Sequence, residues 1–214
     1  MTIRDLNRGS VRLLPLILAV LAFGWLAEVA HGESRAAIGV GTFEAKNGIA
    51  DRGKFALFDV DIDLLIPRVD FRATLSGGSG EGAFGPVDFV AYGAGFDVEV
   101  TPLEAKWEVE IGVALRKSTA LLAEVAPGLR PFGSVEQRIA RVSATRGDFS
   151  FGYSYAFPAP APEKTSEHDI SLRYSALVLG ASWINHKNPI PDGERVSLAL
   201  VYVPGVPINW PWKR

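Results

Sequence analysis

Residues 149–157 have the sequence Phe-Ser-Phe-Gly-Tyr-Ser-Tyr-Ala-Phe, in which every second side chain is aromatic and the side chains between them are small. A period of two is typical of a β-strand, because successive side chains of a strand point to opposite faces of the sheet. The period of an α-helix is 3.6 residues and does not separate these two sets. The segment therefore predicts a strand with one aromatic face and one nearly bare face.

The same period of two recurs along most of the chain. It is clear in residues 58–64, 69–76, 96–101 and 107–115. In residues 58–64, for example, four apolar side chains alternate with three aspartates. Beyond the first 32 residues we find no convincing helical period. The sequence therefore predicts an all-β, antiparallel protein.

Two architectures share this alternation. A soluble sandwich or lipocalin-like barrel points its apolar side chains inward, whereas a membrane barrel points them at lipid. The faces opposite the apolar ones carry charges that could pair inside a lumen, namely Asp59, Asp61, Asp63, Asp70, Arg72, Glu108, Glu110 and Arg173. Aromatic residues suited to a membrane interface lie near the ends of candidate strands, namely Tyr92, Trp107, Tyr202, Trp210 and Trp212. We therefore expect an up-and-down barrel in the outer membrane, with a soluble periplasmic carrier of lipids or small molecules as the alternative.

Turn-forming residues divide the chain into eight to ten candidate strands. An even number returns both termini to the periplasm, and we predict eight strands, with ten as the alternative. Two segments are predicted to be loops. Residues 158–162 are Pro-Ala-Pro-Ala-Pro, which cannot donate to a sheet. Residues 76–82 are glycine-rich, and they lack the Lys-Ser/Thr pair and the following helix of a phosphate-binding loop.

Residues 1–32 have the anatomy of a cleaved signal peptide, with three arginines before an apolar run and an Ala-x-Gly site ending at Gly32. Residues 33–214 are then predicted to form the barrel domain. The formal net charge of -2 shows no basic bias, so we expect no nucleic-acid partner. The chain has no cysteine, and His168 and His186 are the histidines outside the signal peptide. We therefore expect neither a metal site nor another cofactor.

Several segments resemble the outer-membrane lipid A 3-O-deacylases, also called acyloxyacyl hydrolases. They are residues 39–44 (Gly-Val-Gly-Thr-Phe-Glu), the acidic strand at 59–63, residues 93–97 (Gly-Ala-Gly-Phe-Asp), and the closing segment 170–204 with its Asn-Pro-Ile-Pro-Asp-Gly-Glu turn at 188–194. The resemblance implies an eight-stranded barrel that contacts outer-membrane lipid, lipid A included. It also implies a serine esterase that removes the acyl chain at position 3 of lipid A without a metal.

The chemistry of that family needs a His-x-Ser-Asn motif on the penultimate strand, with a glutamate near the final turn to orient the histidine. Here the matching residues 178–184 are Val-Leu-Gly-Ala-Ser-Trp-Ile, without a histidine. A rebuilt triad would use Ser182 as nucleophile, His186 as base and Glu194 as the orienting carboxylate. We expect a noncatalytic barrel, and we keep an active lipid A or phospholipid esterase as the alternative.

Overall fold

The computed structural model describes residues 35–47, 50–64, 66–82, 85–102, 104–122, 134–158, 165–185 and 192–204. The predicted signal peptide and Trp210 and Trp212 lie outside these residues. Ten strands are formed, β1 Arg35–Lys46, β2 Arg52–Asp63, β3 Val69–Gly82, β4 Gly85–Glu99, β5 Glu108–Leu122, β6 Ser134–Arg146, β7 Phe149–Ala156, β8 Ser166–Tyr174, β9 Leu177–Asn185 and β10 Gly193–Tyr202. Within the described ranges, no helix is long and apolar enough to cross a membrane.

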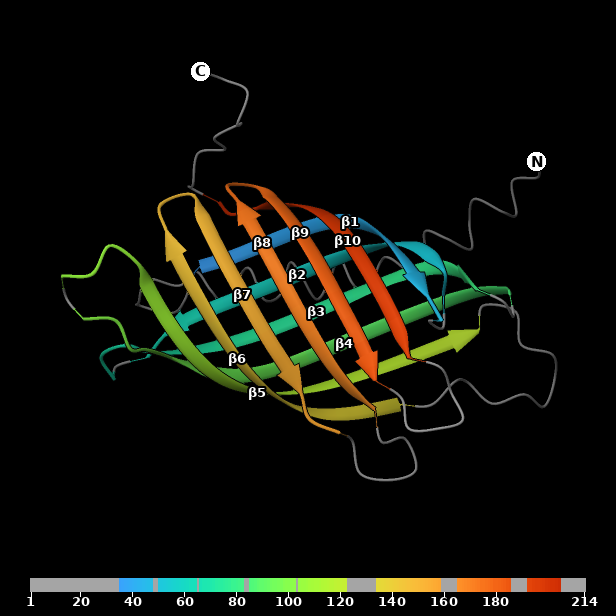
Figure 1. Cartoon of the computed structure of the whole chain (residues 1–214), viewed down its shortest axis with the longest axis horizontal. Helices are drawn as coiled ribbons and strands as arrows, with labels where there is room; N and C mark the ends of the chain where they lie inside the picture. The colour runs from blue at the N-terminus through green and yellow to red at the C-terminus, as the bar shows by residue number, and fades with distance from the viewer. Residues whose placement is uncertain are drawn as a thin grey trace, which may run out of the picture.

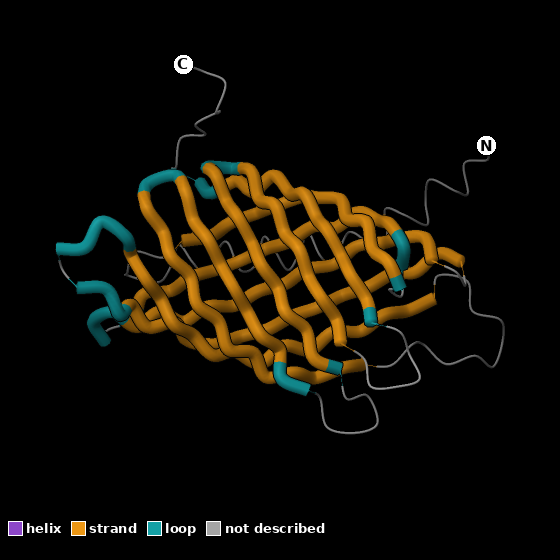
Figure 2. The backbone as a smooth tube through the Cα atoms, in the orientation of Figure 1, coloured by secondary structure: helices purple, strands orange, loops and turns teal. Residues whose placement is uncertain are grey.

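Each strand pairs antiparallel with the next, and β1 also pairs with β10, so the sheet closes into a barrel. Figure 1 shows the tilted strands around this barrel, and Figure 2 shows the same strands with the described turns in teal. The prediction of an all-β, antiparallel up-and-down barrel is confirmed. The predicted count of eight strands is wrong, and the alternative of ten is correct.

The strand count was underestimated because some turns carry no strong sequence signal. β8 and β9 are joined by Ser175 and Ala176 alone, and neither is a glycine or a proline. Ser175 adopts a left-handed φ of 51° there. Serine is not the residue that marks such a position in a sequence scan, so the turn is visible only in the structure.

The glycine-rich residues 76–82, predicted to be a loop, belong to β3 and pair with both β2 and β4. Aromatic rings from β4 and β1 occupy the space that side chains would take here. A Cβ on Gly78 would lie 2.7 Å from the Cζ atom of Phe89, and one on Gly80 would lie 3.3 Å from the Cζ atom of Phe43. Glycine thus marks close packing inside a strand here.

The two ends of the barrel differ. β1 begins and β10 ends at one end, which we call the terminal rim, together with the connections from even-numbered to odd-numbered strands. At the opposite end, which we call the loop rim, the odd-numbered strands β1, β3, β5, β7 and β9 end and the even-numbered strands begin. In membrane barrels the end with the termini faces the periplasm, and the longer loops face the exterior.

Candidate functional site

The register assigns one face of every strand to the interior. Arg116 on β5 contacts Glu167 on β8, and strands this far apart meet only through the lumen. Residues that pair directly across adjacent strands point to the same side of the sheet. The pairs that begin at Arg116 and Glu167 therefore identify the inward-facing residues around the ring. The neighbouring residues point outward, and on β5 these are Val113 and Leu115, which are 62% and 66% exposed. By contrast, the inward-facing Asp97 of β4 is 4% exposed. On β4 and β5, charged side chains therefore face the lumen and apolar side chains face outward.

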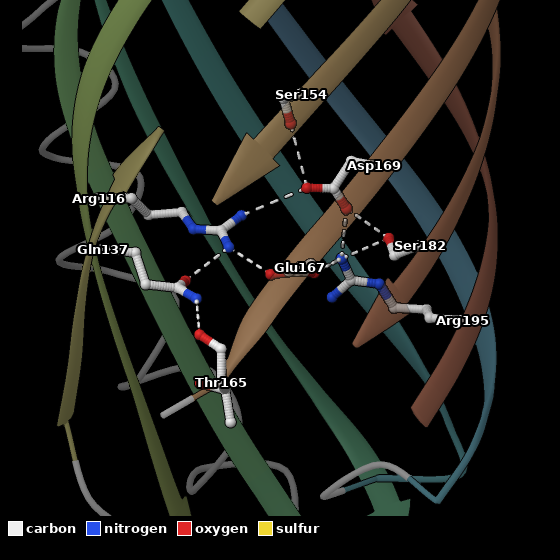
Figure 3. Close-up of polar contacts among 8 residues, drawn as sticks. All are labelled: Arg116, Gln137, Ser154, Thr165, Glu167, Asp169, Ser182 and Arg195. Atoms are coloured by element: carbon white, nitrogen blue, oxygen red, sulfur yellow. Dashed lines mark hydrogen bonds and ion pairs between the residues drawn. The ribbon is translucent and has the colours of Figure 1, made fainter. Parts of the chain in front are cut away.

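A first polar cluster lies in the lumen near the loop rim, and we call it the loop-side network (Figure 3). It consists of Arg116, Gln137, Glu167, Asp169, Ser182 and Arg195. Glu167 is its centre, because it binds Arg116 from β5 and accepts a 2.9 Å hydrogen bond from Arg195 of β10. β5 and β10 lie opposite each other in a ring of ten strands. The network therefore extends across the lumen and does not line one wall alone.

Ser182 is an inward-facing member of this network. Its hydroxyl donates to Asp169 Oδ1 at 2.5 Å, and its oxygen accepts from Arg195 at 3.0 Å. The other oxygen of Asp169 accepts from Ser154 at 3.2 Å. Ser182 is 6% exposed, so its hydroxyl is enclosed by protein partners. This arrangement holds two carboxylates and two guanidinium groups in place, as a buried charge cluster requires.

A second polar cluster, the terminal-side network, lies nearer the terminal rim and consists of Asp59, Asp61, Arg72, Asp97 and Arg141. Arg72 binds Asp59 through two nitrogens and lies 3.3 Å from Asp61. Asp97 accepts two hydrogen bonds from Arg141. Bidentate pairs of this kind are among the stronger polar contacts in proteins. Three of the predicted lumen charges, Asp59, Asp61 and Arg72, thus lie in one cluster with Asp97 and Arg141.

The inner wall of β1 to β4 near the loop rim is apolar. Phe43 and Val87 are buried at its centre, with Phe55 and Phe89 packed against them. The rings rest on glycines of the adjacent strands, since a Cβ on Gly41 would lie 2.6 Å from Phe55 Cζ. At the loop rim, therefore, one half of the lumen is aromatic and the other half carries the loop-side network.

The structure separates the predicted triad. Ser182 faces the lumen, whereas Glu194 precedes the inward-facing Arg195 and points outward, where its direct partners are Trp183 and Lys46. His186 lies outside the described residues. Ser182 and Glu194 therefore lie on opposite sides of the barrel wall and cannot share one site. The carboxylate beside Ser182 is Asp169, which the sequence search did not select.

His168 lies on the outer face of the barrel. Its Nδ1 atom is 2.9 Å from the hydroxyl oxygen of Tyr153, and its ring centroid is 4.8 Å from that of Tyr155. Both tyrosines belong to the aromatic face of residues 149–157. That face thus points outward as predicted, and the face with Ser154 points into the lumen, where Ser154 binds Asp169.

Sequence reasoning missed Arg116, Gln137, Glu167, Asp169 and Arg195. They come from four strands, β5, β6, β8 and β10, and no short motif joins them. Strand alternation could have assigned each to the inner face, but the contacts between non-adjacent strands depend on the closed ring. Among the described residues, no group of three or more metal-ligating side chains is arranged to hold a metal ion.

Comparisons with known proteins give structural similarity only. No protein-family model matches the chain, and no curated protein matches it either. Neisserial surface protein A aligns with 7% identity and a TM-score of 0.36, covering 78% of this chain and 95% of that protein. Ail of Yersinia pestis aligns with 11% identity and a TM-score of 0.31, covering 80% of this chain and 98% of Ail. The N-terminal barrel domain of Pseudomonas aeruginosa OprF aligns with 5% identity and a TM-score of 0.30, covering 79% and 100%. These similarities are too low to assign a family or an activity.

Proposed function

We propose that this protein spans the outer membrane as a noncatalytic ten-stranded barrel. The observation that carries the proposal is the polarity of the wall. Four large apolar side chains on β1, β5 and β10 point outward and are 60–66% exposed, namely Val40, Val113, Leu115 and Val196. Glu167, by contrast, lies in the lumen and is 7% exposed. In water this arrangement would be unfavourable on both faces, because large apolar patches would be exposed on the outer face and charges are buried on the inner face. Lipid around the barrel removes the first cost.

Further features agree with a membrane position. Exposed large apolar residues lie on β1 and on every strand from β4 to β10, so they form a band around most of the ring. Trp107 and Phe149 meet edge to face at the terminal rim, and Arg146 lies over the Trp107 ring. Amphipathic rings and long cationic side chains are favoured at the interface between lipid and water. Closed barrels are one of two structures that satisfy every backbone group in lipid.

The absence of catalysis is part of the proposal. A serine nucleophile needs a base within hydrogen-bond reach and a substrate that can approach it. The Ser182 hydroxyl is held by Asp169 and Arg195 in the interior, and Glu194 points to the other side of the wall. The resemblance to lipid A deacylases then extends only to the up-and-down barrel, which has ten strands here where the resemblance implies eight. Outer-membrane lipid, lipid A included, would be a neighbour of the barrel and not its substrate.

Cell fractionation tests the membrane position. We expect the full chain, expressed in a Gram-negative host, to pellet with the outer membrane and to need detergent for release. The purified protein should migrate faster on a gel before boiling than after it, because a closed barrel stays compact in detergent. Recovery in the soluble periplasmic fraction would instead support the alternative of a soluble carrier.

A further inference from the structure

Most side chains that line the part of the lumen between the two networks are small. On β6, Ile139 is the single inward-facing residue between Gln137 of the loop-side network and Arg141 of the terminal-side network. On β8, Ser171 follows Asp169 on the inward face, and on β3, Thr74 follows Arg72. The small inward-facing residues of this layer are Thr74, Gly93, Ala114, Gly152, Ser171 and Gly180.

This layer is open to water. Ser171 and Thr74 both point inward, and both are exposed. Ser171 lies between its direct partners Gly152 and Gly180, and a Cβ on Gly152 would meet nothing within 4 Å other than the Ser171 hydroxyl. Exposed surface on an inward-facing residue borders the lumen and not the lipid. Solvent-accessible surface therefore lies inside the barrel, between the two networks.

From this exposed inner surface we infer that the barrel encloses a hydrated chamber and conducts small hydrated cations across the outer membrane. The inference rests on the proposed membrane position. The terminal-side network and the loop-side network are the two constrictions, and the layer with Ser171 and Thr74 is the water-filled space between them. Eight strands leave room for side chains alone, whereas the diameter of a barrel grows with its strand number.

The preference for cations follows from the charges that face the lumen near the terminal rim. Within the described strands, the carboxylates on the inward face there are Asp59, Asp61, Asp70, Asp97, Glu99, Glu108 and Glu110, and the arginines are Arg35, Arg72, Arg141 and Arg173. The carboxylates outnumber the arginines. Rings of carboxylates favour cations in a pore, because they replace part of the hydration energy of the ion.

A pair of neighbouring substitutions tests the chamber. Gly180 faces the lumen, and a Cβ there would meet the Ser197 hydroxyl at 2.5 Å, with all other atoms 3.9 Å away or more. Gly180→Leu therefore places a bulky side chain in the chamber. Ala181→Leu adds similar bulk one residue later on the outward face, opposite Ile170 and Val196. In planar bilayers with KCl, we expect wild type and Ala181→Leu to conduct alike and Gly180→Leu to lose most of the current.

A second variant tests the constriction. Arg116→Ala removes one cation of the loop-side network and leaves Glu167 paired with Arg195. We expect a several-fold larger current, and under a KCl gradient a reversal potential shifted further toward potassium. Heat modifiability of each variant shows that the barrel is folded.

The outcomes separate the two proposals. Inserted, heat-modifiable wild-type protein that passes no current overturns the conduction inference and leaves the membrane position intact. Folded Gly180→Leu with an unchanged current also overturns it, as does a preference for chloride. Protein that does not enter the bilayer overturns both proposals.

Discussion

Asp97 of β4 and Arg141 of β6 form a bidentate ion pair across the inner face of β5, directly above Gly112. The backbone of Gly112 lies between their strands as the direct partner of both residues. A Cβ on Gly112 would lie 1.7 Å from Asp97 Oδ1 and 2.8 Å from Arg141 Nε. The ion pair therefore occupies the space that any larger residue at this position would need.

Gly112→Ala is expected to displace this ion pair and to destabilise the folded barrel by about 3 kcal/mol, since separating a buried pair leaves charges without partners. The free energy of unfolding can be measured by urea titration in lipid vesicles. Gly152→Ala is the matched control, because its new methyl group would meet only the Ser171 hydroxyl, which can move by rotation about one side-chain bond. Equal effects of the two substitutions would contradict the explanation.

If the outer face contacts lipid, an arginine placed there should destabilise the barrel by an amount that depends on its depth in the membrane. Val113→Arg, in the middle of the apolar band, should destabilise the barrel by about 2–4 kcal/mol. Ser79→Arg, on an exposed outward position near the loop rim, should cost about 0–1 kcal/mol. The same vesicle titration measures both. On a soluble surface both substitutions would fall within about 0.5 kcal/mol, and that result would favour the soluble carrier.

The glycine-rich part of β3 should tolerate larger side chains on its outward face but not on its inward face. A Cβ on Gly78 would lie 2.1 Å from the Lys54 carbonyl oxygen as well as close to the Phe89 ring. Gly78→Val should therefore cost more than about 2 kcal/mol through overpacking. Ser79→Val, on the adjacent outward position, is the control and should leave the urea midpoint nearly unchanged. A tolerated Gly78→Val would mean that this segment is a loop after all.

Catalysis is expected to be absent. Membranes that contain the wild-type protein should release no 3-linked acyl chain from lipid A above background, and Ser182→Ala and His186→Ala should change nothing in that assay. Mass spectrometry of lipid A from expressing cells provides the measurement. If lipid A loses this chain, and either substitution abolishes the loss, the protein is an esterase.

Ser182→Ala should nevertheless affect stability. It removes a hydrogen bond to Asp169 and one from Arg195, and we expect a loss of about 1–2 kcal/mol. Ser197→Ala provides a comparison at an inward-facing serine outside the network. An unchanged free energy of unfolding in Ser182→Ala would show that the hydroxyl does not support the charge cluster.

The sequence alone determined the fold class and the two faces of most strands. Alternation in residues 58–64, 69–76, 96–101, 107–115 and 149–157 was sufficient, because a strand sorts its side chains by a local rule that needs no knowledge of its neighbours. The same rule identified Asp59, Asp61 and Arg72 as lumen residues before any contact was known.

The tertiary structure alone decided which inward-facing residues meet, and with them the candidate site. Arg116, Glu167 and Arg195 are far apart in sequence and lie on three non-adjacent strands, so their contact depends on the number of strands and on closure of the ring. The strand number itself depended on turns such as the one at Ser175. The separation of Ser182 from Glu194 was likewise set by the register, since a shift of one residue moves a side chain to the other side of the wall.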